Sequence, residues 1–584
     1  MEVENKKVLL SVKDLHVKFR VRGRVLSAIR GISLDIYENE SIAIVGESGS
    51  GKSVFTKTFA GMLDANGYID QGSIIFNDED LADTHVALRS LDKRLLANVQ
   101  KKLDRCCALQ FGGAEYRQLL ELESEKKRRA DLTEEEKKET TDKIRDLNFK
   151  RTELFNQRQT VDKSKEKARY KEMSAEIDAM DAEIKHLKKE QEKALAAHKQ
   201  EAKNDTAFMA QYNAKKAELE EARAQKIKQT PTDEMLKQNE LIAKEVYLSV
   251  GRYSLVRRVK VLSQLGKAIK KAMTMGLDLA DENVLNGIFD EYAFRVRYLD
   301  EENDVLHGTC VLNLAKIKYG KDWTQIRGGK IATVFQDPMT SLNPIIPIGK
   351  QITSVILKHQ DCSELEARAR AMELMKKVGI PNAETRFDDY PFQYSGGMRQ
   401  RIVIAIALSC QPKILICDEP TTALDVTIQA QILKLIKDLQ REFNYTIVFI
   451  THDLGVVANV ADRVAVLYAG QIVEMGTVEE IFYDPRHPYT WALLSSLPQL
   501  AQRNTTLFSI TGTPPSLYNS IVGDAFAPRN PYCLKLDTLA EPPMFQISET
   551  HFAKTWLLDP RAPKFEKPEI IQNIHEKLVD AFNI

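Results

Sequence analysis

The sequence of 584 residues lacks several features that mark common protein classes. No uninterrupted apolar stretch approaches the roughly 18 residues of a membrane-spanning helix, and the first residues lack the apolar core of a secretory signal. The seven cysteines are scattered and form no C-x-x-C pair, which argues against a disulfide framework or a zinc knuckle. The 83 basic and 83 acidic residues cancel, so no overall cationic field attracts nucleic acid or anionic lipid. We expect a cytosolic chain with local binding sites.

Glycine and proline are absent between residues 114 and 230, and 52 of the 110 residues from 121 to 230 are charged. The absence of helix breakers in so polar a segment predicts long helices. Five apolar residues in it are spaced by four and three positions, as one seam of a heptad repeat requires: Met173, Ile177, Met180, Ile184 and Leu187. A second, interrupted seam begins at Ile144. We expect two antiparallel, coiled-coil-like arms; one solvated helix or disorder is the alternative.

The next segment carries blocks of opposite charge. Residues 252 to 271 hold seven bases and no acids, whereas residues 277 to 304 hold nine acids and two bases. We expect helices whose blocks neutralise each other, because basic helix faces are usually solvated or paired. A contact with lipid or RNA is the alternative interpretation.

A glycine-rich segment, Gly46-Glu-Ser-Gly-Ser-Gly-Lys-Ser53, follows the apolar stretch Ser41–Val45. It fits G-x-x-x-x-G-K-[ST] between an expected strand and an expected helix from Ser53 to Met62. Glycines let successive amides turn inward, so a phosphate chain is held by N–H groups at a helix N-terminus. Lys52 adds a charge at the β and γ phosphates, and the Ser53 hydroxyl can ligate Mg²⁺. The nucleotide-binding residues predicted here are Gly46, Ser48, Gly49, Ser50, Gly51, Lys52 and Ser53.

A second apolar stretch, Ile414–Cys417, ends in Asp418 and Glu419. A buried parallel strand would deliver both carboxylates to its C-terminal edge in this way. Asp418 suits the outer shell of a Mg²⁺ ion, and Glu419 could orient or partly deprotonate an attacking water. Alone the pattern is weak, because apolar runs that end in Asp-Glu are frequent strand exits.

The order of the other motifs strengthens this interpretation. Gln336 and the segment Ser395–Gln400 precede Asp418, whereas Asp425 and His452 follow it. At these residues the chain resembles the ABC-type ATPases, in which phosphate loop, Q-loop, signature motif, Walker B, D-loop and switch histidine occur in this order. The resemblance implies an α/β P-loop ATPase with a RecA-like core, an antiparallel β subdomain and a helical signature subdomain, working as a head-to-tail dimer.

The resemblance also assigns roles to individual residues. It implies catalytic roles for Glu419, for His452 as a donor to the phosphoryl group and for Gln336 as a contact to Mg²⁺ or water. Ser53, Gln336 and Asp418 become the Mg²⁺ ligands. Phe19 matches an aromatic that stacks on adenine, with a core residue of an amphipathic strand as the alternative. Asp425 is the D-loop residue, and the signature that meets the partner's phosphate loop comprises Ser395, Gly396, Gly397, Met398, Arg399 and Gln400.

Three segments narrow the resemblance to the ATP-binding subunits of oligopeptide and dipeptide permeases, a group that includes nickel importers: Gln336–Pro344, Arg486–Thr490 and Thr511–Leu517. Lys52 and Gln336 stand 284 residues apart, although such a crossover takes on the order of 30 residues, so a large module is inserted. We expect four parts: an ATPase N-terminal part (residues 1–84), a helical insertion (85–318), the ATPase remainder (319–484) and a C-terminal permease-type extension (485–584).

The implied function is ATP-driven import of oligopeptides or dipeptides, with ATP and Mg²⁺ as cofactors. The implied partners are a second ABC ATPase subunit, two transmembrane permease subunits and an extracytoplasmic solute-binding protein, so the chain would lie at the cytoplasmic face of the cell membrane. Import of nickel or another small solute is the nearer alternative. A coiled-coil-bearing DNA-repair or chromosome ATPase is the remote one, because the insertion precedes Gln336 and the chain is neutral; no nucleic acid is expected.

Many relatives carry four cysteines in the C-terminal region that can hold an iron-sulphur cluster. Here those positions are occupied by Asp524, Asn530, Asp537 and Thr555. Such clusters are held mainly by thiolates, so we expect this chain to bind none.

Overall fold

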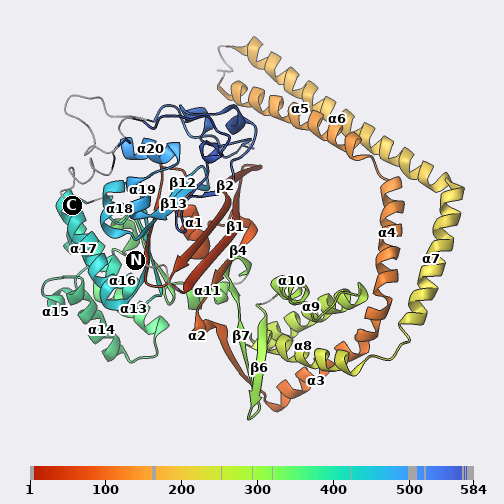
Figure 1. The fold of residues 1–584 in the computed structure, drawn as a ribbon, viewed down its shortest axis with the longest axis horizontal. Helices are drawn as coiled ribbons and strands as arrows, with labels where there is room; N and C mark the ends of the chain where they lie inside the picture. The colour runs from red at the N-terminus through yellow and green to blue at the C-terminus, as the bar shows by residue number, and fades with distance from the viewer. Residues whose placement is uncertain are drawn as a thin grey trace. The chain divides into compact units, whose positions relative to one another are not determined.

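The computed structural model describes residues 6–160, 166–251, 253–292, 294–317, 320–422, 424–496, 510–518, 521–568, 571–572 and 574 (Figure 1). The chain divides into two compact units: unit 1 consists of Met1–Ala82 with Val311–Ile584, and unit 2 of Asp83–Cys310. Within the described ranges, no helix combines the length and apolarity that crossing a membrane requires.

Unit 1 begins with an antiparallel sheet of four strands in the order β2-β1-β4-β8. Apolar residues alternate along β1 and point to a buried face, as the two-residue period of a strand requires. β4 pairs with β8 through Ile75 opposite Asn313 and Phe76 opposite Leu312, although unit 2 separates these strands in sequence. The strands are β1 (Val8–Val21), β2 (Arg24–Tyr37), β4 (Gly67–Phe76) and β8 (Leu312–Asn313).

The larger sheet of unit 1 has eight strands in the order β14-β15-β13-β12-β3-β11-β10-β9. Its five strands from β12 to β9 run parallel, and β3 and β11 are buried along their whole length. Continuous burial is typical of parallel strands that are covered on both faces. The strands are β3 (Ser41–Val45), β9 (Ile331–Val334), β10 (Ile414–Asp418), β11 (Thr446–Thr451), β12 (Arg463–Tyr468), β13 (Gln471–Thr477), β14 (Phe545–Gln546) and β15 (Phe552–Ala553).

Several helices of unit 1, among them α13, α16 and α17, share one hydrophobic core with this sheet, through buried residues such as Ile352, Ile402 and Ile436. The expected α/β P-loop core is therefore confirmed. The helices are α1 (Lys52–Phe59), α2 (Glu79–Ala82), α11 (Gly320–Ile326), α12 (Pro338–Ser341), α13 (Ile348–His359), α14 (Glu364–Lys377), α15 (Ala383–Arg386), α16 (Gly396–Leu408), α17 (Val426–Phe443), α18 (Leu454–Val460), α19 (Val478–Tyr483) and α20 (Pro488–Ser495).

Unit 2 contains a small antiparallel sheet of β5 (Asp83–Ala87), β7 (Val305–Cys310) and β6 (Val296–Glu302), in that order. One face of it packs against the helix α8 (Asp233–Gly251). The neighbouring strand β6 explains Gly308, because a Cβ atom there would lie 2.4 Å from the Arg297 carbonyl oxygen, and 3.0 Å from the Leu248 side chain of α8. The sheet thus has one covered face and one face that α8 does not cover.

Unit 2 has a hydrophobic core that consists of buried residues of α3 (Ser90–Cys107), α8, α9 (Leu255–Thr274) and α10 (Glu282–Asp290). Arg258 of the basic helix α9 forms an ion pair with Asp92 of α3 at 2.8 Å, and the Tyr247 hydroxyl also donates to Asp92. The expectation that the block from 252 to 271 is neutralised by the acidic block after it is thus wrong for Arg258, because the basic helix packs on α3.

In the long charged segment, the described residues on either side of 161–165 form the helices α4 (Gly113–Arg129), α5 (Glu134–Thr160), α6 (Lys167–Asn204) and α7 (Thr206–Lys226). α5 lies beside α6 and α4 beside α7 (Figure 1). Met173, Ile177 and Ile184 are the buried residues of α6, as the seam in the sequence predicts. A coiled-coil supercoil in this segment stays a prediction.

Candidate nucleotide-binding site

The glycine-rich loop joins the buried strand β3 to the helix α1. Gly49 and Gly51 have φ angles of +79° and +106°, which lie in the region that favours glycine. A Cβ atom on Gly46 would lie 2.1 Å from the Leu467 carbonyl oxygen, so no larger residue fits there. Ser48 is exposed, whereas the hydroxyl of Ser50 is buried and, among the described residues, has no hydrogen-bond partner. An orphaned hydroxyl in such a loop suits a phosphate oxygen.

Lys52 opens α1 and folds back over the loop. Its Nζ atom donates to the carbonyl oxygens of Gly46 at 2.7 Å and Glu47 at 3.0 Å. Burial lowers the pKa of Lys52, whereas the carboxylates of Glu419 and Asp418 act in the opposite direction. The ammonium group is thus held at the loop by two neutral carbonyl oxygens. An anion such as a phosphate can replace them, because its hydrogen bonds to a cation are stronger.

Ser53 and Asp418 meet from two different elements of unit 1. The Ser53 hydroxyl, on α1, donates to Asp418 Oδ1 at 3.0 Å, at the C-terminal end of β10. Burial raises the pKa of Asp418, and the hydrogen bond from Ser53 lowers it. A hydroxyl and a carboxylate that converge in this way form an oxygen donor set of the kind that Mg²⁺ prefers.

Three site residues follow adjacent parallel strands: Gln336 after β9, Glu419 after β10 and His452 after β11. The Glu419 carboxylate accepts from Gln336 Nε2 at 2.8 Å and lies 3.1 Å from His452 Nδ1. It also accepts from the Thr422 hydroxyl at 3.1 Å. Because the carboxyl ends of parallel strands meet at one sheet edge, residues far apart in sequence converge on one carboxylate.

Glu419 has a φ angle of +47°, which is uncommon for a residue with a side chain. Its backbone N–H donates to the Ile450 carbonyl oxygen at 3.0 Å, so the pairing with β11 holds this conformation. The side chain keeps 18% of its surface exposed, which leaves the carboxylate reachable from solvent.

The predicted signature residues begin the helix α16. Ser395 caps this helix by accepting from the Met398 N–H at 3.4 Å, and Ser395 and Gly396 are exposed. A Cβ atom on Gly397 would lie 2.7 Å from the Ile428 side chain, so α17 packs closely at this point. Asp425 caps α17 by accepting from the Ile428 N–H at 3.0 Å.

Two further signature residues point into unit 1. Arg399 donates through Nε to the Pro391 carbonyl oxygen at 2.7 Å and also contacts the Met339 sulfur, three residues after Gln336. Gln400 is completely buried, and the described part of the chain offers its amide no hydrogen-bond partner. Arg399 thus links the segment after Gln336 to the signature helix.

Phe19 lies on β1, opposite Leu26 on β2 and Gly67 on β4. Its ring packs against Gly67, where a Cβ atom would lie 2.7 Å from the ring, and only 9% of the residue is exposed. This placement gives Phe19 a packing role; its stacking on adenine stays a prediction.

The sequence did not point to the contacts of Glu47 with the C-terminal region. The Arg529 guanidinium forms two hydrogen bonds with the Glu47 carboxylate, at 2.7 and 3.0 Å, and donates to the Tyr468 hydroxyl at 3.2 Å. The Glu47 N–H donates to the Tyr489 hydroxyl at 2.8 Å. Tyr489 belongs to the segment Arg486–Thr490, which in the sequence narrowed the family resemblance. That segment was the one sequence signal that could have pointed to this contact. The phosphate loop is therefore anchored to the C-terminal region.

The four positions at which the resemblance implies cysteines are buried and act as local caps. Asp524, Asn530 and Asp537 accept from the N–H groups of Phe526, Tyr532 and Leu534 at 3.0, 2.9 and 2.6 Å, and Thr555 accepts from that of Leu557 at 3.3 Å. Oxygen and amide side chains already bonded to the backbone do not fit the thiolate ligation of an iron-sulphur cluster.

Comparisons with known proteins agree with this geometry. The family "ABC transporter" matches residues 29–257 and 297–422, and "Oligopeptide/dipeptide transporter, C-terminal region" matches residues 473–535. The oligopeptide transport ATP-binding protein AmiE of Streptococcus pneumoniae is 65% identical over 266 residues, which cover 46% of this chain and 75% of that protein.

Two other relatives are similar. The oligopeptide transport ATP-binding protein OppD of Bacillus subtilis is 60% identical over 263 residues, covering 45% of this chain and 74% of that protein. The dipeptide transport ATP-binding protein DppD of Lactococcus lactis is 55% identical over 300 residues, covering 51% and 80%. The phosphate loop, the carboxylates behind it and these matches lead to one conclusion: the chain belongs to the ABC transporter family and is an ATPase of its oligopeptide/dipeptide group.

Proposed function

We propose that this chain binds and hydrolyses ATP as a subunit of an importer for oligopeptides or dipeptides. Its relatives are named for oligopeptide and dipeptide transport, and its C-terminal region matches that of such transporters, which favours peptides over nickel. The chain would lie at the cytoplasmic face of the membrane with two permease subunits, a second ATPase subunit and an extracytoplasmic solute-binding protein.

The residues of the loop fit ATP and Mg²⁺. The amides of the loop from Gly46 to Gly51, the orphaned Ser50 hydroxyl and the Lys52 ammonium would hold the phosphates. Ser53, Asp418 and the carbonyl of Gln336 would hold Mg²⁺, which supplies positive charge against the phosphate oxygens when bound.

The observation that carries the proposed chemistry is the convergence of Gln336, Thr422 and His452 on Glu419. In the assigned role, the Glu419 carboxylate orients the attacking water and accepts its proton. Gln336 and His452 hold that carboxylate from two neighbouring strands, so its position is fixed before water arrives. When the water enters, Gln336 and His452 can exchange their contacts with Glu419 for the water and the phosphoryl oxygens.

The exposed Ser395 and Gly396 would face the phosphates bound by the partner subunit. An N-terminal turn of a helix offers N–H groups to an anion, so Ser395, Gly396 and Gly397 would complete a site that one chain leaves open. Asp425, at the start of the neighbouring helix α17, would lie at the same interface.

The proposal is tested in cells whose own gene for this subunit has been deleted. Glu419→Gln keeps the hydrogen-bonding shape but removes the base, so peptide uptake and ATP hydrolysis should both fall at least about 100-fold while ATP binding remains. Glu479→Gln, which changes an exposed carboxylate on α19, is the matched control and should behave as wild type. Restored nickel uptake without peptide uptake would overturn the substrate assignment, and unchanged hydrolysis by Glu419→Gln would overturn the role of Glu419.

A further inference from the structure

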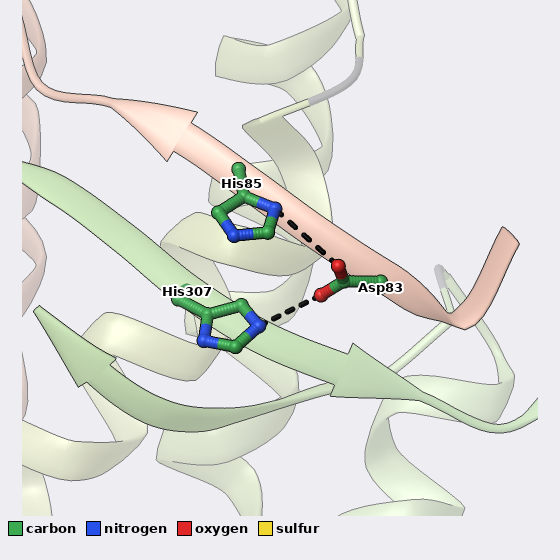
Figure 2. Close-up of side chains that lie close together, drawn as sticks. All are labelled: Asp83, His85 and His307. Atoms are coloured by element: carbon green, nitrogen blue, oxygen red, sulfur yellow. Dashed lines mark hydrogen bonds and ion pairs between the residues drawn. The ribbon is translucent and has the colours of Figure 1, made fainter. Parts of the chain in front are cut away.

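The face of the small sheet of unit 2 that α8 does not cover carries four metal-ligand side chains. His85 on β5 lies directly opposite His307 on β7, and His307 lies opposite Asp300 on β6. Asp83 precedes His85 by two residues and so lies on the same face of β5. Figure 2 shows the two imidazole rings and, beside them, the Asp83 carboxylate that interacts with both. Residues 224 positions apart in sequence are thus brought together.

The distances within this group are those of a potential ligand set. Asp83 Oδ1 lies 2.7 Å from His307 Nε2, and Asp83 Oδ2 lies 3.6 Å from His85 Nδ1. One ligand atom from each of the three side chains lies within 4.8 Å of the others. A tetrahedral ion with bonds of about 2.0 to 2.1 Å holds its ligand atoms about 3.3 Å apart, so shifts of roughly an ångström bring the three atoms into place.

Asp300 occupies the position of an orienting carboxylate. Its Oδ2 lies 3.4 Å from His307 Nδ1, on the side of the ring away from Asp83. A proton held on Nδ1 by a carboxylate leaves Nε2 with a free electron pair, and this arrangement is common for histidines that bind metals.

The two imidazole rings lie parallel to each other. His85 and His307 are stacked at 4.3 Å between ring centres and 11° between ring planes. This stacking brings Nδ1 of His85 and Nε2 of His307 to the same carboxylate, that of Asp83. Neutral imidazole is the form that ligates metal ions.

The sheet that holds the group packs on α8 through its other face. The side chains keep access to solvent, with 50% of Asp83, 55% of His85 and 28% of His307 exposed. An ion can therefore enter without unfolding the sheet, and water can fill its remaining position.

We propose that Asp83, His85 and His307 bind one divalent transition-metal ion of the zinc type, with Asp300 as the orienting carboxylate. Two imidazoles and one carboxylate suit zinc better than Mg²⁺ or Ca²⁺, which prefer oxygen ligands alone. The ion joins β5, at the start of unit 2, to β7, at its end, and so fastens the two ends of this unit together. An ion that binds only the folded state stabilises it.

The test is titration of the full chain, without nucleotide and with any purification tag removed, with Zn²⁺ alone by calorimetry. We expect one ion per chain at this site and loss of it in His307→Ala and His85→Ala, with affinity reduced more than about 100-fold. Asp300→Asn should weaken binding by roughly 10- to 100-fold, as expected for an outer-shell partner. His186→Ala, an exposed histidine on α6 paired with Glu190, is the matched control and should bind as wild type.

Further readouts separate this site from the nucleotide site. Visible bands of bound Co²⁺ should disappear in His307→Ala but persist in Asp418→Asn, and Zn²⁺ should raise the melting temperature of wild type but not of His307→Ala. Circular dichroism of each variant confirms that it is folded. Equal Zn²⁺ affinity in wild type and the His85→Ala and His307→Ala variants would overturn the proposal, as would the absence of any binding.

Discussion

Arg529 is expected to control ATP binding without touching the nucleotide. Its guanidinium holds Glu47 of the phosphate loop by two hydrogen bonds, and its side chain is only 4% exposed. Glu47 raises the pKa of Arg529, so the guanidinium stays charged. The substitution Arg529→Gln removes the charge and the forked geometry but keeps a polar, shorter side chain.

The loss can be estimated from the burial of the pair. Breaking a buried ion pair costs roughly 3 to 5 kcal/mol. The Glu47 side chain is 27% exposed, so water can solvate part of the freed carboxylate and the expected loss is about 2 to 3 kcal/mol. Because the Tyr489 hydroxyl still accepts from the Glu47 N–H, the loop keeps part of its anchor. We therefore expect about half of this free energy to appear as weaker ATP binding, which corresponds to roughly tenfold lower affinity.

A double-mutant cycle checks this reasoning by titration with a fluorescent ATP analogue. Glu47→Gln combined with Arg529→Gln leaves no unpaired charge and should bind ATP more tightly than Arg529→Gln alone. Arg561→Gln, at an exposed arginine of the same C-terminal region, is the matched control and should have no effect. Wild-type ATP affinity and melting temperature in Arg529→Gln would refute the argument.

Three further predictions concern separate parts of the chain. Lys52→Ala should weaken ATP binding by at least about tenfold, measured by the same titration, because it removes the cation at the loop. Burial raises the pKa of Asp524 to about 6, above the ordinary 3.8. The folded state therefore binds this proton more tightly than the unfolded state does. As pH rises from about 4 to about 6, the free energy of unfolding falls because the buried carboxyl must ionise. Asp524→Asn should remove that loss, worth up to about 3 kcal/mol, and melt higher than wild type near pH 7.5 in calorimetry; an unchanged pH profile would contradict it. Replacing Asp83–Cys310 by a short Gly-Ser linker should keep ATP affinity within about threefold, and an insoluble or unfolded product would show that the two units depend on each other.

The α/β core was predictable because its signals are local. The apolar stretch before Gly46 and the spacing from Gly46 to Ser53 predict a strand, a loop and a helix, and the structure has β3 and α1 there. The stretch before Asp418 likewise forms β10. Such signals lie within a few residues of each other, so one sequence is enough to detect them.

Contacts between distant segments carry no such signal. The bond between Glu47 and Arg529 joins residues 482 positions apart, and no spacing rule connects an acid in a loop to an arginine in a C-terminal region. The same applies to His85 and His307, which meet only because β5 pairs with β7. The expected pairing of the charge blocks was wrong for Arg258 because composition shows how many charges balance, not which helices pack.

The pairing of β4 with β8 has a consequence for engineering. Ile75 and Phe76, near the point where the chain leaves unit 1, lie opposite Asn313 and Leu312, near the point where it returns. Partners across antiparallel strands are about 5 Å apart at their Cα atoms, so the ATPase chain meets a gap that a few residues can close. A reporter protein whose own termini lie close together can therefore be inserted at this junction in place of unit 2. The pairing register of β4 and β8 would stay unchanged.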